Sequence, residues 1–234
     1  EGPINRSTNT TYIAHYRYST LKIIQSMGAD LGSIPDFQDL SFKIYHPTRK
    51  MGVFSFFGIG GLSHEVGEHG EYKMNSNMST VGLSNSLTLH SKTFFRTVIA
   101  LSGWNYTWDE GSNIGTDSDP IDYAWETDIK EYTLKAAFSV NRKISAKHKI
   151  HSGLIFEQAF NDSYMGWYSD TLQTSYSNID TSSRAATVQA YLNWQYRITE
   201  KLTFNTGIHY LQFYLNNRYS VEPRFGLQWE LHPR

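Results

Sequence analysis

Apolar and polar residues alternate over ten segments of the chain, and this alternation is the main clue to its structure. The last segment shows it most clearly: one side of an extended strand would carry Val221, Pro223, Phe225, Leu227, Trp229 and Leu231. The other side would carry Glu222, Arg224, Gly226, Gln228 and Glu230. Because successive side chains of a strand point to opposite faces, each segment predicts a strand with one apolar and one polar face.

The predicted strands are long. Several exceed the roughly five or six residues usual in soluble proteins and match the roughly nine to eleven that cross a tilted membrane wall. They extend over Tyr12 to Ile24, Gln38 to Tyr45, Val53 to Ser63, Asn75 to Leu89, Phe94 to Tyr106, Ile129 to Arg142, Lys149 to Phe160, Arg184 to Ile198, Leu202 to Tyr214 and Ser220 to Leu231.

The connections between these strands alternate in length. HPTRKMG, HSKT, KISAKHK and TEK are short hairpin turns, whereas the connections that alternate with them and are expected at the opposite end are HEVGEHGEYKM, Asp109 to Asp128, Asn161 to Ser183 and NNRY. The short turns are also basic, with Arg49, Lys50, Lys92, Arg142, Lys143, Lys147, Lys149 and Lys201. Outer-membrane barrels separate short periplasmic turns from long extracellular loops, so the sequence predicts an all-β, antiparallel transmembrane barrel wall.

Composition agrees with this fold class and excludes several others. Aromatic residues make up 15% of the 234 residues, and no stretch approaches the roughly 20 apolar residues of a membrane helix. A formal net charge of -1 gives no pull toward nucleic acid. The chain has no cysteine, which removes disulfides and thiolate metal sites, and the first residues lack the pattern of a secretory signal.

The polar sides of the last strands are expected to face the interior of the barrel. These interior-facing candidates are Gln189, Asn193, Gln195, Glu222, Arg224, Gln228 and Glu230. Pro223 has no amide hydrogen for the sheet, so we expect a bulge at this position.

Three stretches of the chain resemble a known family. YRYSTL (Tyr16 to Leu21), FQDLSFKIYHPTRKMGVFSFFGIGG (Phe37 to Gly61) and YSVEPRFGLQWEL (Tyr219 to Leu231) are similar to barrel segments of Bacteroidetes TonB-dependent receptors, of the type with a carboxypeptidase-regulatory-like domain. The resemblance implies a bacterial outer-membrane protein whose 22-stranded barrel takes up a small nutrient, with energy relayed by the TonB system through a plug. Residues 1–234 would then be about ten strands of that barrel, without plug, signal peptide or TonB-contacting segment. The implied partners are outer-membrane lipid, the TonB system and the nutrient.

Two aromatic groups are candidates for ligand binding. Trp104, Tyr106 and Trp108 lie at the end of one strand, and Tyr164, Trp167 and Tyr168 lie near the end of another. Such rings stack on sugars or aromatic ligands. The alternative is an aromatic girdle at the lipid headgroups, which the sequence favours.

Metal binding is not expected. In HEVGEH the two histidines, His64 and His69, are five residues apart, not four as in the zinc-binding HExxH helix. The acidic segment holding Asp109, Glu110, Asp117, Asp119, Asp122, Glu126 and Asp128 lacks the calcium-loop pattern and is expected to be a solvated loop. No nucleophile elbow or Walker-type loop is present, so we expect neither an enzyme nor a cofactor.

Two other functions remain open at this stage. A ten-stranded omptin-like outer-membrane protease would recruit Asp109, Asp162 and His64. A soluble β-sandwich binding module would also have alternating strands, but it would bury their apolar faces against a second sheet.

Overall fold

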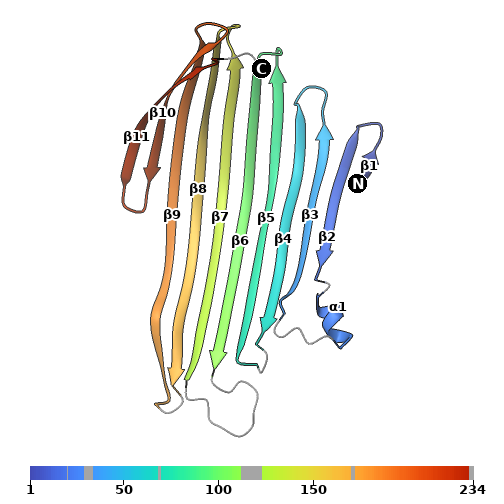
Figure 1. The fold of residues 1–234 in the computed structure, drawn as a ribbon, viewed down its shortest axis with the longest axis vertical. Helices are drawn as coiled ribbons and strands as arrows, with labels where there is room; N and C mark the ends of the chain where they lie inside the picture. The colour runs from blue at the N-terminus through green and yellow to red at the C-terminus, as the bar shows by residue number, and fades with distance from the viewer. Residues whose placement is uncertain (20, 29–33, 68–69, 112–122, 170–171, 232–234) are drawn as a thin grey trace.

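The computed structural model describes residues 1–19, 21–28, 34–67, 70–111, 123–169 and 172–231. In this part of the chain, eleven strands form one antiparallel sheet in which every strand pairs with its neighbours in sequence (Figure 1). The elements are β1 (Gly2–Asn5), β2 (Thr10–Tyr18), α1 (Leu21–Ser26), β3 (Asp36–Pro47), β4 (Val53–Val66), β5 (Tyr72–Leu89), β6 (Thr93–Gly111), β7 (Tyr123–Lys143), β8 (His148–Ser169), β9 (Thr174–Arg197), β10 (Leu202–Phe213) and β11 (Arg218–Trp229).

All ten predicted strands are present, and the antiparallel all-β fold is confirmed. Two differences occur near the N-terminus. The short strand β1 was missed because its sequence GPIN consists largely of residues that are rare in strands. The first predicted strand ends at Tyr18 rather than Ile24, and the adjacent apolar pair Ile23 and Ile24, which breaks the alternation, lies in α1.

The pairing of the strands assigns each side chain to one of two faces, because residues directly opposite each other lie on the same face. One continuous row of paired residues crosses eight strands, from β2 to β9. It contains Tyr12, Ile44, Phe56, Leu83, Ile99, Ala136, Phe156 and Val188. We call this side of the sheet the apolar face and the opposite side the polar face.

No second layer covers the apolar face within the described residues. No hydrophobic side chain there is buried, and Leu83, Ile99 and Leu192 on central strands are 59%, 51% and 47% exposed. A β-sandwich would bury these side chains between two sheets, so the sandwich alternative is wrong. An uncovered apolar surface of this extent is typical of a protein face that meets lipid.

The bulge expected at Pro223 is absent. Pro223 pairs with Ile208 in unbroken register on β11, the edge strand of this sheet. The amide of Glu230 donates a backbone hydrogen bond to the carbonyl of Lys201, and this bond sets the hydrogen-bonding pattern between β10 and β11. The backbone groups of even-numbered residues of β11 bond to β10, and those of odd-numbered residues point to the open edge of the sheet. Proline is tolerated there because its missing amide hydrogen has no partner to lose. The bulges that do occur lie at Pro3/Asn5 and Met165/Gly166.

The predicted separation of short from long connections is found only in part, because the short connection of residues 214–217 between β10 and β11 lies at the opposite end from the other short turns (Figure 1). The four connections predicted as short hairpin turns do lie together at one end of the sheet. We call this end, formed by residues 6–9, 48–52, 90–92, 144–147 and 198–201, the turn end, and the opposite end the loop end. The predicted long loop from Asn161 to Ser183 is wrong. Most of it extends β8 and β9, with only residues 170–173 between these strands.

These extensions make the central strands far longer than a membrane requires. At about 3.3 Å per residue, the 24 residues of β9 span about 80 Å, whereas the apolar band of a barrel is about 25 Å tall. On β9 a regular alternation of apolar and polar side chains runs only from Val188 to Tyr196. Among the described residues, no helix combines the length and the apolar character needed to cross a membrane.

Candidate functional site

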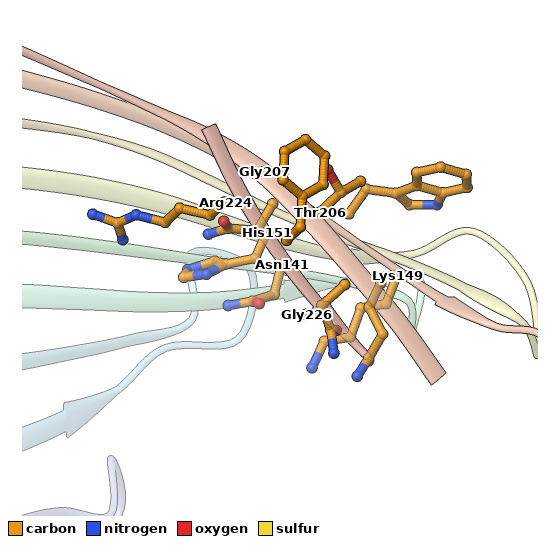
Figure 2. Close-up of a pocket in the computed structure, with 12 residues that line it drawn as sticks. Asn141, Lys149, His151, Thr206, Gly207, Arg224 and Gly226 are labelled. Carbon is orange, nitrogen blue, oxygen red and sulfur yellow. The ribbon is translucent and has the colours of Figure 1, made fainter. Parts of the chain in front are cut away.

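The polar face carries a pocket of about 420 Å³ near the turn end. One row of paired residues forms its centre, namely Asn141 on β7, His151 on β8, Asn193 on β9, Gly207 on β10 and Arg224 on β11. Figure 2 shows the side chains of Asn141, His151 and Arg224 on the same side of the sheet. Lys149, Gln195, Asn205 and Thr206 complete the polar lining, so the pocket is lined by amide, hydroxyl and cationic residues and by no carboxylate.

Gly207 gives the pocket its shape. A Cβ atom at this position would collide with Oδ1 of Asn193 and would lie 2.8 Å from the carbonyl oxygen of Leu192. The absent side chain leaves room for the Asn193 amide beside Arg224. Any larger residue at position 207 would push this amide out of the row.

A polar network beside the pocket connects β9, β10 and β11. Oε2 of Glu222 accepts a hydrogen bond from Nη2 of Arg224 at 3.0 Å, and Oε1 accepts one from the Ser220 hydroxyl at 3.2 Å. His209 on β10, only 14% exposed, lies between Gln189 on β9 and Glu222 on β11. Its Nε2 is 3.3 Å from Oε1 of Gln189, and its Nδ1 is 3.3 Å from Oε2 of Glu222 without hydrogen-bond geometry.

A second pocket, of about 460 Å³, lies on the polar face between β2 and β7. Nε of Arg17 and Oδ2 of Asp39 form an ion pair of 2.7 Å in its wall. Trp104 and Glu131 line another part of the wall, and Nε1 of Trp104 donates a hydrogen bond to the Ser76 hydroxyl at 3.2 Å. This pocket therefore combines opposite charges with an aromatic wall.

The structure separates the predicted aromatic candidates by face. Trp104, Tyr106 and Trp108 lie on the polar face of β6, as does Trp167 on β8, whereas Tyr164 and Tyr168 lie on the opposite side. An interfacial girdle must lie on the apolar face, so this register is incompatible with a girdle role for the three residues of β6.

Further rings that the sequence analysis did not mark lie with them on the polar face toward the loop end. The set, which we call the aromatic patch, consists of Tyr72, Trp104, Tyr106, Trp108, Trp125, Trp167 and Tyr176. Tyr72 stacks on Trp108 with 4.6 Å between ring centroids, and Trp167 stacks on Tyr176 at 4.4 Å. Trp125 pairs with both Glu110 and Trp167. Its position in the alternating AWETD sequence was the available signal for it.

The predicted interior-facing residues share the polar face. Gln189, Asn193 and Gln195 on β9 lie on the same side as Glu222, Arg224 and Gln228 on β11, and Glu230 directly follows that strand. Asn193, Gln195 and Arg224 meet in the first pocket. Gln189 and Glu222 instead contact His209. The pocket residues Asn141, Lys149 and His151 were missed because they lie beside the polar turn between β7 and β8, where alternation carries little information.

The acidic and histidine candidates do not converge. Nδ1 of His64 lies 2.8 Å from Oδ1 of Asn75, while His69, Asp117, Asp119 and Asp122 lie outside the described residues. Within the described part of the chain, no three His, Cys, Asp or Glu residues are placed to hold a metal ion.

The remaining acidic candidates Asp109, Glu110, Glu126 and Asp128 lie in strands rather than in a loop. Oδ2 of Asp128 pairs with Nζ of Lys130 at 2.6 Å, and this hydrogen bond and charge raise the pKa of Lys130. The residues considered for a protease, His64, Asp109 and Asp162, lie on β4, β6 and β8 with a strand between each pair.

Comparisons with known proteins bear on the fold. No protein-family model and no curated protein matches the chain. Among solved structures, the chain is similar to "Copper transporter OprC", with a TM-score of 0.62 and 8% identity over 93% of this chain and 36% of that one. The chain thus spans about a third of that protein's length.

Two other solved structures are less similar. The translocator domain of the autotransporter NalP from Neisseria meningitidis has a TM-score of 0.43 and 10% identity, over 93% of this chain and 72% of that one. The ferric yersiniabactin uptake receptor FyuA from Yersinia pestis has a TM-score of 0.48 and 11% identity, over 88% and 42%. Of these three, only the similarity to the copper transporter supports the fold, and because the sequence identity is 8%, it supports nothing further.

Proposed function

We propose that this chain forms part of the wall of a TonB-dependent receptor in a bacterial outer membrane, and that the receptor takes up a small nutrient. The observation that carries the proposal is the uncovered row of apolar side chains across eight paired strands. On this proposal the apolar face meets lipid and the polar face lines the interior of the barrel. The fold similarity to a transporter and the family resemblance of the three barrel-like stretches support it.

The apolar band has the dimensions of a membrane wall. From Val188 on β9 to Ile198 directly after this strand, ten residue steps cover about 33 Å, which a tilt of about 40° reduces to about 25 Å. The turn end then lies on the periplasmic side and the loop end outside the cell. Strand extensions beyond the band stand in water, where polar residues such as Asn105, Lys130 and Asp162 replace the apolar side chains of that face.

The aromatic patch is the first part of the polar face that an incoming ligand meets. Its stacked pairs Tyr72–Trp108 and Trp167–Tyr176 offer flat apolar surfaces, while Glu110 accepts a hydrogen bond from Nε1 of Trp108 at 3.1 Å. Rings with nearby polar groups bind planar or sugar-like ligands by stacking. The second pocket, with Trp104 and the Arg17–Asp39 pair, and then the first pocket follow toward the turn end.

Uptake by cells that express the protein tests this function. A panel of metal chelates and oligosaccharides is offered to cells with and without a functional TonB system. We expect accumulation of one ligand class only when TonB is present. Equal uptake with and without TonB would overturn the proposed dependence on TonB.

Matched substitutions test the role of the polar face in ligand binding. Trp104→Ala and Trp108→Ala should each weaken binding by about fivefold to about 150-fold, since stacking of a flat ligand on one ring contributes about 1–3 kcal/mol. Tyr168→Ala removes an aromatic ring at similar height on the other face and should leave binding unchanged. Loss of binding in Tyr168→Ala alone would reverse the assignment of the two faces.

A further inference from the structure

Charge is distributed unevenly along the strands. The turns of the turn end and the residues next to them contain ten basic side chains and two acidic ones, Glu200 and Glu230. The basic residues are Arg6, Arg49, Lys50, Lys92, Arg142, Lys143, Lys147, Lys149, Arg197 and Lys201. The chain as a whole has a net charge of -1, so this excess is a property of one end.

The basic turns lie side by side. Backbone hydrogen bonds connect the amide of Lys143 to the carbonyl of Lys92 at 2.8 Å, and that of Arg197 to Lys147 at 2.8 Å. A third connects Glu230 to Lys201 at 2.9 Å. The side chains of Lys92, Lys147 and Lys201 are exposed, and none has an ion-pair partner among the described residues. They form a continuous positive rim.

Aromatic rings line the apolar face directly beside this rim. His148 stacks on Tyr196 with 4.6 Å between centroids and on Trp194 with 5.6 Å, and Nε1 of Trp194 donates to Nδ1 of His148 at 3.2 Å. Trp229 lies on the same face next to Lys201, opposite Leu202. Amphipathic rings at the edge of an apolar band are typical of the headgroup level of a bilayer.

The loop end has a different charge. On β6 to β9 its strands carry Asp109, Glu110, Glu126, Asp128, Glu131, Asp162 and Asp180, against Lys130 and Arg184. A positive rim next to interfacial rings, at one end only, fits a surface of negative phosphates at that end. Basic side chains near a membrane surface are attracted to anionic lipids over about one Debye length.

We infer that the turn end binds the headgroups of anionic phospholipids in the leaflet that it meets, with Lys92, Lys147 and Lys201 beside the Trp194 and Trp229 rings. The inference rests on the membrane crossing proposed above. It adds a lipid preference to that proposal and assigns the preference to one end of the wall.

Fluorescence quenching by brominated lipids tests the inference. The chain is folded into phosphatidylcholine vesicles that contain equal fractions of brominated phosphatidylglycerol or brominated phosphatidylcholine. The signal of Trp194 and Trp229 is obtained as the difference from the variant W194F/W229F. We expect the brominated phosphatidylglycerol to associate about threefold or more strongly, and the preference to fall to near one in about 1 M salt.

Two matched variants locate the preference. The triple variant K92Q/K147Q/K201Q should lose most of it, whereas K73Q/K130Q/R184Q, which removes the same charge from the loop end, should retain it. Circular dichroism and the gel mobility of unheated protein establish that each variant is folded. If a variant fails to fold, the salt dependence of the unmodified chain still decides the question.

Each remaining outcome has a definite meaning. Equal quenching by both lipids would overturn the lipid preference, leave the membrane crossing intact and direct attention to an acidic protein partner for the rim. A preference that survives high salt or the turn-end variant would also overturn it. Absence of quenching by either lipid would contradict the crossing itself.

Discussion

Two rows of paired side chains lie on the same face of the sheet and have opposite character. The row nearer the turn end is apolar across eight strands, from Tyr12 to Val188. The row nearer the loop end contains Asn77, Asn105, Lys130, Asp162 and Ser182. Both rows belong to the same continuous strands.

The comparison separates what forms a strand from what places it in lipid. Backbone pairing continues without a break through both rows, and in the second row it is supplemented by polar contacts such as the hydrogen bond from Ser182 to Asp162 at 2.9 Å. The change from apolar to polar side chains within one face therefore marks a change of solvent, not a change of fold. The lipid-facing apolar band therefore ends between the apolar row and the polar row.

A charge placed on the apolar band should have the largest effect. Leu192→Arg puts a guanidinium on the apolar face of β9 and should lower the free energy of unfolding by about 2–4 kcal/mol, since an arginine near the bilayer midplane is poorly solvated. Gln195→Arg on the polar face and Ser182→Arg in the polar row should each change it by less than about 1 kcal/mol. Urea unfolding in vesicles measures all three. Equal losses for Leu192→Arg and Ser182→Arg would remove the distinction between the rows.

Filling the space at Gly207 should have the next largest effect. Gly207→Ala places a methyl group against the Asn193 amide and should lower the free energy of unfolding by about 1–3 kcal/mol. Gly226→Ala is the matched control, because the nearest atom, Cβ of Asn205, is 4.0 Å away. Equal free energies of unfolding for the two variants would show that the Asn193 side chain moves aside without loss of stability.

Removing a stacked ring at the loop end should cost less. Trp108→Ala removes the stack on Tyr72 and should lower the free energy of unfolding by about 0.5–1.5 kcal/mol. In the Trp108→Ala background, Tyr72→Ala should have a smaller effect than alone, because the two rings share one contact. A double-mutant cycle measures this coupling, and strict additivity would contradict the stack.

The half-buried pair of Lys130 and Asp128 should contribute least. Because Asp128 raises the pKa of Lys130, the pair favours the folded state below the ordinary lysine value of 10.5, and this contribution is lost as the pH rises through the raised value. Lys130→Met should therefore be less stable than the unmodified chain by the same small margin at every pH from about 6 to about 9, and the margin should shrink as the pH rises above 10.5. Titration of unfolding with pH checks this. Divergence near neutral pH would indicate that position 130 contacts more than Asp128.

The sequence alone predicted the part of the fold where one face meets an apolar surrounding. In β9 the alternation from Val188 to Tyr196 marked both the strand and its faces, whereas the segment from 174 to 183 consists mostly of polar residues without alternation and was taken for a loop. Alternation arises only where the two faces meet different surroundings, so a strand in water on both sides leaves no such signal.

The candidate site depended on strand register, which one sequence does not contain. The polar side of β10 included His209, but only pairing brings it between Gln189 and Glu222. Pairing likewise brings Trp125 beside Trp167 and separates Trp167 from Tyr168. The sequence therefore predicted which type of side chain each face carries, but not which side chains lie next to one another.

A spin-label scan along β9 tests the central claim most directly, and the chain contains no native cysteine that would interfere. Single cysteines are introduced at positions 176–183 and 188–197, labelled, and measured in vesicles for collision with oxygen, which concentrates in lipid, and with a water-soluble nickel complex. We predict that even positions from 188 to 196 are accessible to oxygen and odd ones to nickel, while positions 176–183 are accessible to nickel without alternation. Even positions in the band that are shielded from both reagents, as under a second protein layer, would contradict the account.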